Sequence, residues 1–324
     1  MDIQKRKLIK NIMLLGALAP FNSLILADEL NMLKDRSVIK TIPGNFRYIY
    51  ENTEYKAAFY QFLVNVFHLY PEADFHRLIE QLSHEFEDDK TIFIGIQDGL
   101  AEFKPFLSEL FYALPALIKQ KKLIAEQTAS LLNPELTYDG YLELGSSGRY
   151  LDSLEEKFTI QGEKYFIAEK SPAYTPADIL DRGQIPFAGQ FQLLENYQVN
   201  IAKLIPSNSL DFVNVYIGFH HCPVDLRESF IGSIRDAMKP GASLIIRDHN
   251  AHNEEMFRMV ALAHDVFNLG TNESWNYNDN ELRLFYSLET LDEMMKNFGF
   301  KSDGTRLYQE GDPTLNALMR YTKV

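Results

Sequence analysis

Strand-like and helical segments alternate along the second half of the chain, and this alternation is the strongest constraint on its fold. Short apolar runs typical of buried strands lie at residues 140–144, 165–168, 210–217 and 242–247. Between the last two, Leu226, Phe230 and Ile234 recur at the spacing of one helix face, which stops at Lys239-Pro240-Gly241. Strands alternating with helices predict a doubly wound, mostly parallel sheet of the α/β class over residues 133–324.

The end of the chain predicts an antiparallel addition to this sheet. A helix through Leu291 and Met294 ends at Gly299, and strand-like segments at 306–309 and 315–322 follow it. The turn residues Gly311-Asp312-Pro313 separate these segments. We therefore expect a C-terminal antiparallel hairpin.

Residues 28–132 show a helical pattern instead. Ala58, Phe59, Phe62 and Val66 recur at three- and four-residue spacing, which predicts one apolar stripe along a helix. Pro71 precedes acidic residues in a pattern typical of a helix start. A further helical stretch passes through Phe106, Leu110, Leu114 and Leu117 to Leu131, and Pro115 is expected to break or kink it. This all-helical region contains no catalytic constellation, so we interpret it as an N-terminal cap region.

The first 27 residues differ from the rest. A basic stretch containing Lys5, Arg6 and Lys7 is followed by an apolar run over residues 12–19, and Ala27 precedes acidic Asp28. This order predicts a signal-like or membrane-anchoring leader over residues 1–27, with possible membrane association. Pro20 interrupts an apolar run that is short for a membrane-spanning helix. The alternative is an amphipathic helix packed on the protein.

The net charge and the cysteine content exclude several classes of function and of site. The net charge of −13 argues against nucleic-acid binding, which depends on clustered lysine and arginine. A small-molecule substrate is therefore the better expectation. The chain has a single cysteine, Cys222, so it forms no intrachain disulfide and no cysteine-rich zinc site.

A glycine-containing loop follows the first predicted strand. Tyr141-Leu142 leads into Glu143 and then Gly145-Ser146-Ser147-Gly148, and a helical segment comes next. Glycines allow the backbone to come close to a ligand at the carboxyl edge of a sheet. Glu143 disfavours a phosphate ligand, and no lysine follows in the P-loop pattern. A carboxylate suits a cofactor with a positive ammonium group.

The loop Glu143 to Arg149 resembles the first signature of class I S-adenosylmethionine-dependent methyltransferases, although that signature usually has three glycines and this loop has two. Residues 206–213, 216–221 and 238–241 resemble later segments of the same family. The resemblance covers residues 133–324 and implies a Rossmann-like domain that binds S-adenosylmethionine. The implied cofactor-binding residues are Glu143, Gly145, Ser146, Gly148, Glu169, Asn196 and Gly218, with Asn200 as a rival to Asn196.

Four polar residues at the ends of neighbouring strands are the candidate catalytic group. His220 and His221 end one strand, and Asp248 and His249 end the next. Their side chains are expected to meet at one sheet edge, where a histidine paired with an acid can take a proton from the methyl acceptor. A metal site that also includes His252 is the alternative, because imidazole and carboxylate bind first-row metals. The predicted site contains no metal.

A last set of residues falls in an expected loop that contributes to substrate choice: Trp275, Asn276, Glu281 and Arg283. Arg247 and Arg283 are candidates for holding a substrate anion, with surface salt bridges as the alternative.

The leading hypothesis is a methyltransferase acting on a small molecule. The alternatives are an enzyme that uses a nicotinamide cofactor and a non-catalytic binding or scaffold protein with a degenerate methyltransferase fold. For localisation, the leader indicates export or membrane association, whereas the supply of S-adenosylmethionine indicates the cytoplasm.

Overall fold

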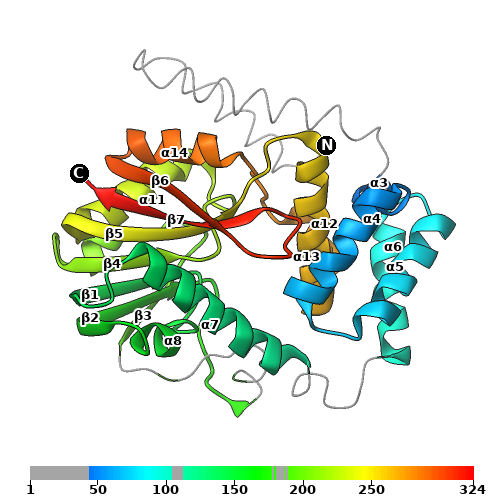
Figure 1. Ribbon diagram of the computed structural model, residues 1–324, viewed down its shortest axis with the longest axis horizontal. Helices are drawn as coiled ribbons and strands as arrows, with labels where there is room; N and C mark the ends of the chain where they lie inside the picture. The colour runs from blue at the N-terminus through cyan, green and yellow to red at the C-terminus, as the bar shows by residue number, and fades with distance from the viewer. Residues whose placement is uncertain (1–43, 104–111, 177–178, 180–185, 187–188) are drawn as a thin grey trace. The chain divides into compact units, whose positions relative to one another are not determined.

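A seven-stranded sheet forms the centre of the C-terminal half of the chain (Figure 1). The computed structural model describes residues 44–103, 112–176, 179, 186 and 189–324. The predicted leader at residues 1–27 and the predicted helical positions Phe106 and Leu110 lie outside the described residues. Residues 44–324 belong to one compact unit.

The strand order is β3-β2-β1-β4-β5-β7-β6. The strands are β1 (Thr137–Leu144), β2 (Thr159–Ala168), β3 (Gln190–Leu193), β4 (Leu210–Val215), β5 (Met238–His249), β6 (Phe300–Tyr308) and β7 (Asn316–Lys323). The first five pair in parallel, whereas β7 is antiparallel to both β5 and β6. The predicted α/β sheet with a C-terminal antiparallel hairpin is therefore confirmed.

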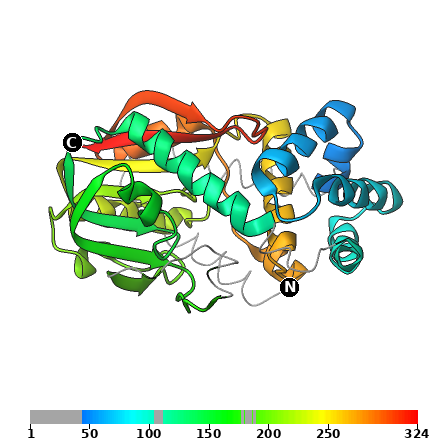
Figure 2. The same cartoon turned by 60° about the horizontal axis from the view of Figure 1, so that its bottom comes forward.

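Successive side chains of each strand point to opposite faces of the sheet, and both sets are apolar. Helices therefore cover both faces. Leu142 of β1 and Val213 of β4 belong to the core shared with α10 (Ile201–Leu204), α11 (Val224–Ala237) and α14 (Leu288–Asn297). Their neighbours Tyr141 and Phe212 belong to the opposite core, shared with α7 (Leu114–Leu131) and α8 (Leu151–Glu155). Figures 1 and 2 show α7 on one face, with α11 and α14 on the other. Because both faces are buried, these strands are nearly continuous apolar runs, and this is the pattern that predicted them.

The sheet order reverses between β1 and β4. In a doubly wound sheet, the crevice outside the carboxyl ends of the strands at this reversal is where ligands bind. The loops after β1 and β4 flank it, so the fold brings together the two sequence segments that contain most of the predicted site residues.

The helical region precedes the sheet. It contains α3 (Asn45–Tyr50), α4 (Thr53–Phe62), the π-helix η2 (Leu63–Phe67), α5 (Glu72–Glu85), α6 (Asp89–Gly99) and the 3-10 turn η3 (Leu100–Glu102). Pro71 caps the start of α5, as predicted. Pro115 lies in the first turn of α7, where its missing N–H needs no partner. Residues 112–113 just before α7 are π-helical, so the break expected at Pro115 coincides with the start of the α-helix.

Helix α12 (Glu254–Gly270) joins the helical region to the rest of this unit. Its residues Met259, Leu262 and Val266 belong to the same apolar cluster as Phe46 and Phe93. Helix α13 (Trp275–Asn280) follows it. Among the described residues, no helix is both long enough and apolar enough to cross a membrane.

A partly buried acid, Asp89, lies beside the start of α3 and makes the stability of the protein depend on pH. The backbone N–H groups of Asn45 and Phe46 donate to the Asp89 carboxylate at 2.7 and 3.2 Å. Burial, and next the negative charge of Asp265, raise the pKa of Asp89 to about 7. In the unfolded chain an aspartate has a pKa of about 4, so between pH 4 and 7 the unfolded chain holds fewer protons at this position. The free energy of unfolding therefore falls as the pH rises through this range.

We expect this loss to be about 2–4 kcal/mol in the native chain and to be absent in Asp89→Asn. Urea unfolding at pH 5 and pH 8 measures it as the difference between the two proteins. Asp98→Asn, which changes an exposed acid on the same helix, is the control and should behave as the native chain does. Parallel pH profiles for the native chain and Asp89→Asn would contradict the prediction.

Candidate functional site

The loop after β1 bends sharply at two glycines. Gly145 has φ of +89° and Gly148 has φ of +92°, a region that L side chains rarely adopt. A Cβ atom on Gly145 would lie 2.5 Å from Cδ1 of Ile217, in the loop after β4. Glycine is therefore required at position 145 both by the backbone and by the close approach of the neighbouring loop.

The carboxylate of Glu143 lies inside this loop and is fully buried. It accepts hydrogen bonds from the Tyr141 hydroxyl at 2.8 Å, from the Ser146 hydroxyl, and from the backbone N–H groups of Gly148 at 3.1 Å and Tyr150 at 3.4 Å. Burial raises the pKa of Glu143. The structure thus places Glu143 and Ser146 as organisers of the loop, with their polar atoms directed at the chain itself.

Two other predicted cofactor residues follow β2 and β3 at the same edge of the sheet. Glu169 comes directly after β2, and Asn196 comes three residues after the end of β3; both are exposed. Asn196 is the middle of three successive residues with positive φ, from Glu195 to Tyr197. Strained backbone of this kind concentrates at functional sites. The rival Asn200 occupies the N-cap position of α10, where its side chain makes no capping hydrogen bond.

Gly218 supports the candidate catalytic group. It has φ of +71°, and a Cβ atom there would lie 2.3 to 2.7 Å from the atoms of the Asp248 carboxylate. The chain therefore needs glycine at this position for Asp248 to occupy its place.

Asp248 is the centre of the polar cluster and is 2% exposed. Its Oδ1 accepts hydrogen bonds from Nδ1 of His220 at 2.7 Å and from the backbone N–H of His249 at 2.8 Å. Its Oδ2 accepts from the Tyr286 hydroxyl at 2.6 Å and from the backbone N–H of Phe219 at 3.2 Å. Although burial opposes ionisation, the charge and hydrogen bond of His220 lower the pKa of Asp248 to about 2.

The structure adds His264, which the sequence analysis did not include. His264 lies in α12, and its Nε2 is 3.2 Å from Nε2 of His220. Its Nδ1 donates to the backbone carbonyl of Val260 at 2.9 Å. The only signal in the sequence is a histidine within the apolar stretch of this helix, one turn after Val260.

The other two histidines are also held at Nδ1. His221 donates from Nδ1 to the carbonyl of Leu282 at 2.7 Å, and Nδ1 of His249 is 2.9 Å from the Thr314 hydroxyl. Burial, and next the neighbouring His220, lower the pKa of His221 to about 4 and that of His249 to about 3. The same two causes lower the pKa of His264 well below its usual value. These three imidazoles are therefore neutral at pH 7.

The predicted substrate-anion residues have protein partners. The buried Arg283 guanidinium donates to Asp265 at 2.6 Å, to Glu281 at 2.7 Å and to Asn278 at 2.7 Å. Arg247 donates to Gln309 at 2.6 Å. Arg283 therefore forms salt bridges, as the alternative had it, but they are buried and not on the surface.

The expected loop at residues 275–283 is partly wrong, because Trp275 and Asn276 begin helix α13. The Trp275 ring packs edge-on against Phe93 at a centroid distance of 5.4 Å. The local signal for this helix is Ser274, whose hydroxyl accepts a hydrogen bond from the backbone N–H of Tyr277 at 3.2 Å and caps the helix.

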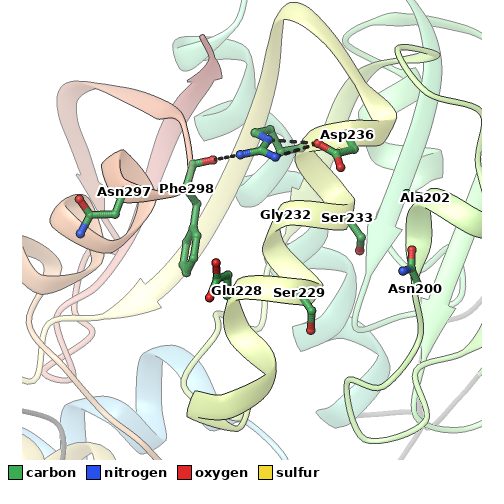
Figure 3. Close-up of a pocket in the computed structure, with 10 residues that line it drawn as sticks. Asn200, Ala202, Glu228, Ser229, Gly232, Ser233, Asp236, Asn297 and Phe298 are labelled. Carbon is green, nitrogen blue, oxygen red and sulfur yellow. Dashed lines mark hydrogen bonds and ion pairs between the residues drawn. The ribbon is translucent and has the colours of Figure 1, made fainter. Parts of the chain in front are cut away.

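One pocket lies away from these residues, between α10, α11 and the end of α14 (Figure 3). It has a volume of about 370 Å³ and includes Glu228, Ser229 and Asp236 of α11 and Phe298 after α14. Of the predicted or rival site residues, only Asn200 lines it. It is therefore separate from the glycine loop and from the histidine cluster.

No protein-family profile and no curated protein matches this sequence. The chain is structurally similar to many S-adenosylmethionine-dependent methyltransferases of the class I fold, at low sequence identity. One is the 1,6-didemethyltoxoflavin-N1-methyltransferase of Burkholderia thailandensis, with 13% identity over 64% of this chain and 79% of the other, at a TM-score of 0.40. An O-methyltransferase family 2 protein of Planctomyces limnophilus has 14% identity over 77% of this chain and 69% of the other, at a TM-score of 0.44. An S-adenosylmethionine-dependent methyltransferase of Mesorhizobium loti has 11% identity over 61% of this chain and 98% of the other, at a TM-score of 0.42.

Proposed function

We propose that this protein binds S-adenosylmethionine at the loop after β1 and transfers its methyl group to a small-molecule acceptor. The observation that supports this proposal best is the loop itself. Two left-handed glycines, closed around the buried Glu143, lie beside the point where the sheet order reverses. A buried carboxylate in this loop disfavours a phosphate group and is compatible with a cofactor whose near end carries an ammonium.

The remaining cofactor residues follow from their positions at the same sheet edge. We assign Gly145, Gly148 and Gly218, which all have positive φ, to the backbone that lines the cofactor, and Ser146 to loop closure with Glu143. Two further residues extend the site along the ends of the neighbouring strands: Glu169, as the acceptor for the ribose hydroxyls, and Asn196, near the adenine.

For the chemical step we propose the group His220, His221, Asp248 and His249. Asp248 fixes His220 with its Nδ1 protonated, and this leaves Nε2 as the atom able to accept a proton. Methyl transfer also needs the acceptor atom aligned with the sulfonium methyl group. We further propose that residues 28–132 form a cap and that residues 133–324 form the methyltransferase domain.

The test is calorimetric titration of the full-length protein with S-adenosylmethionine, S-adenosylhomocysteine and NADH. We expect the first two to bind and NADH to give no heat. Binding of NADH alone would replace the proposal with the nicotinamide alternative, and binding of none would remove the cofactor site.

A glycine substitution tests the location of the site. Gly145→Ala is expected to weaken S-adenosylmethionine binding by more than about 10-fold, because alanine at positive φ costs about 1–2 kcal/mol and its Cβ meets Ile217. The matched control is Gly304→Ala in β6, which has φ of +82° and nothing within 4 Å of the added Cβ. Both variants lose stability, but only Gly145→Ala should lose affinity in the same titration. Equal affinities in the two variants would place the cofactor elsewhere.

A further inference from the structure

Three histidine rings meet at the sheet edge beside the proposed catalytic group. One ring nitrogen of each of His220, His221 and His264 lies within 4.8 Å of one ring nitrogen of each of the other two. His220 and His221 follow β4, whereas His264 comes from α12. Folding therefore builds this triad from two separate elements of the chain.

The hydrogen bonds of the triad fix which nitrogen of each ring is free to bind a ligand. Nδ1 of His221 faces the Leu282 carbonyl and Nδ1 of His264 faces the Val260 carbonyl. A carbonyl only accepts hydrogen bonds, so these Nδ1 atoms carry the proton and the Nε2 atoms carry a lone pair. Nδ1 of His220 donates to the Asp248 carboxylate in the same way. Nε2 of His221 and Nε2 of His264 are therefore electron-pair donors, and Nε2 of His220 is one whenever that ring is neutral.

The spacing of two of these atoms matches ligands of one ion. Nε2 of His220 and Nε2 of His264 are 3.2 Å apart, a distance at which two lone pairs repel unless a cation lies between them. Two imidazoles bound tetrahedrally to one zinc ion at about 2.0–2.1 Å are separated by about 3.3 Å. A proton shared by His220 and His264 is the competing explanation, and it gives His221 no role.

We propose that His220, His221 and His264 bind a divalent first-row transition metal ion through their Nε2 atoms. Imidazole is the ligand that suits such ions. Metal-binding histidines typically donate their other ring N–H to a carboxylate or a backbone carbonyl, and here all three do so. His249 is a neighbour outside the triad, because its Nδ1 faces Thr314 and its Nε2 lies 3.4 Å from the amide of Asn316.

The site is only partly enclosed. His220 is buried, while His221 and His264 are partly exposed. Three protein ligands leave at least one position for water or for an oxygen atom of a substrate, which is the pattern of catalytic metal sites. If the proposed methyl transfer is correct, an acceptor hydroxyl bound there would lose its proton to water more readily, since the ion stabilises the resulting oxyanion. The ion would then take the place of Nε2 of His220 in promoting this proton loss, because a ligated nitrogen has no lone pair left to accept a proton. That consequence rests on the proposed function, whereas metal binding itself does not.

The test uses the full-length protein after removal of bound metal with a chelator, titrated with cobalt(II) in the absence of any methyl donor. We expect visible absorption from one cobalt ion per chain. His264→Ala and His221→Ala should each weaken cobalt binding by more than about 10-fold. His252→Ala, which changes an exposed histidine near the same edge of the sheet, is the matched control and should bind as the native chain does.

Circular dichroism and urea unfolding establish that each variant is folded before its cobalt titration is interpreted. His221 is the safer variant for this purpose, because it is partly exposed and bonds to a single carbonyl. The proposal is overturned if the native chain binds no stoichiometric cobalt, or if the folded His221→Ala variant binds as tightly as His252→Ala. Because no methyl donor is present, neither result depends on whether the protein binds S-adenosylmethionine.

Discussion

Replacing Asp248 with alanine is expected to lower the free energy of unfolding by about 3–5 kcal/mol, because it leaves the buried partners of an ionised group unpaired. Four donors lose their acceptor at once: Nδ1 of His220, the Tyr286 hydroxyl, and the backbone N–H groups of Phe219 and His249. All four belong to the described core of the sheet edge, where water does not readily replace the carboxylate. Urea unfolding at pH 7 measures the change.

Tyr286→Phe provides a graded comparison, since it removes one of the four hydrogen bonds and keeps the ring. We expect it to cost about 1–2 kcal/mol. Asp236→Ala, at an acid that is exposed on α11, should change stability by less than about 0.5 kcal/mol. A loss in Asp248→Ala no larger than that in Asp236→Ala would show that Asp248 does not organise the cluster.

The second large effect is expected at Glu143. Glu143→Ala removes the acceptor for the Tyr141 and Ser146 hydroxyls and for two backbone N–H groups of the loop. We expect S-adenosylmethionine binding to fall below detection by calorimetry, because the loop loses the group around which it closes.

Glu143→Gln separates the two roles considered for this residue. Glutamine keeps an oxygen that can accept from Ser146 and Gly148, so a loop-organising role predicts less than about 10-fold loss of affinity. A direct contact between the carboxylate and the cofactor ammonium predicts a loss of about 1.5–3 kcal/mol, or about 10- to 100-fold. Equal binding by Glu143→Ala and the native chain would contradict both roles.

The sequence predicted the sheet because the signal for each strand is local. Side chains of runs such as Leu210 to Val215 alternate between two buried faces, and both faces are covered by helices that have their own apolar stripes. The glycines at 145 and 148 were also recognisable, since positive φ is a requirement of the loop itself.

The histidine triad could be predicted only in part. His220 and His221 stand beside strand residues that mark the sheet edge, but His264 is 44 positions from His220 and joins it through the packing of α12. The apolar periodicity of a helix does not indicate which residue of another element a polar side chain of that helix will contact. The orientation of the Glu143 carboxylate also could not be predicted from the sequence. It depends on the positions of the Ser146 hydroxyl and the loop N–H groups in the folded loop.

Helix α12 contacts two separate parts of the protein. Met259, Leu262 and Val266 pack with the helical region, while His264, on the same helix, reaches His220 at the sheet edge. Metal–ligand distances tolerate deviations of only about 0.2 Å. We therefore expect the helical region to hold His264 in position through its packing on α12. A shortened protein that contains only residues 133–324 would keep His220, His221 and His264, but we expect it to lose the packing that positions His264.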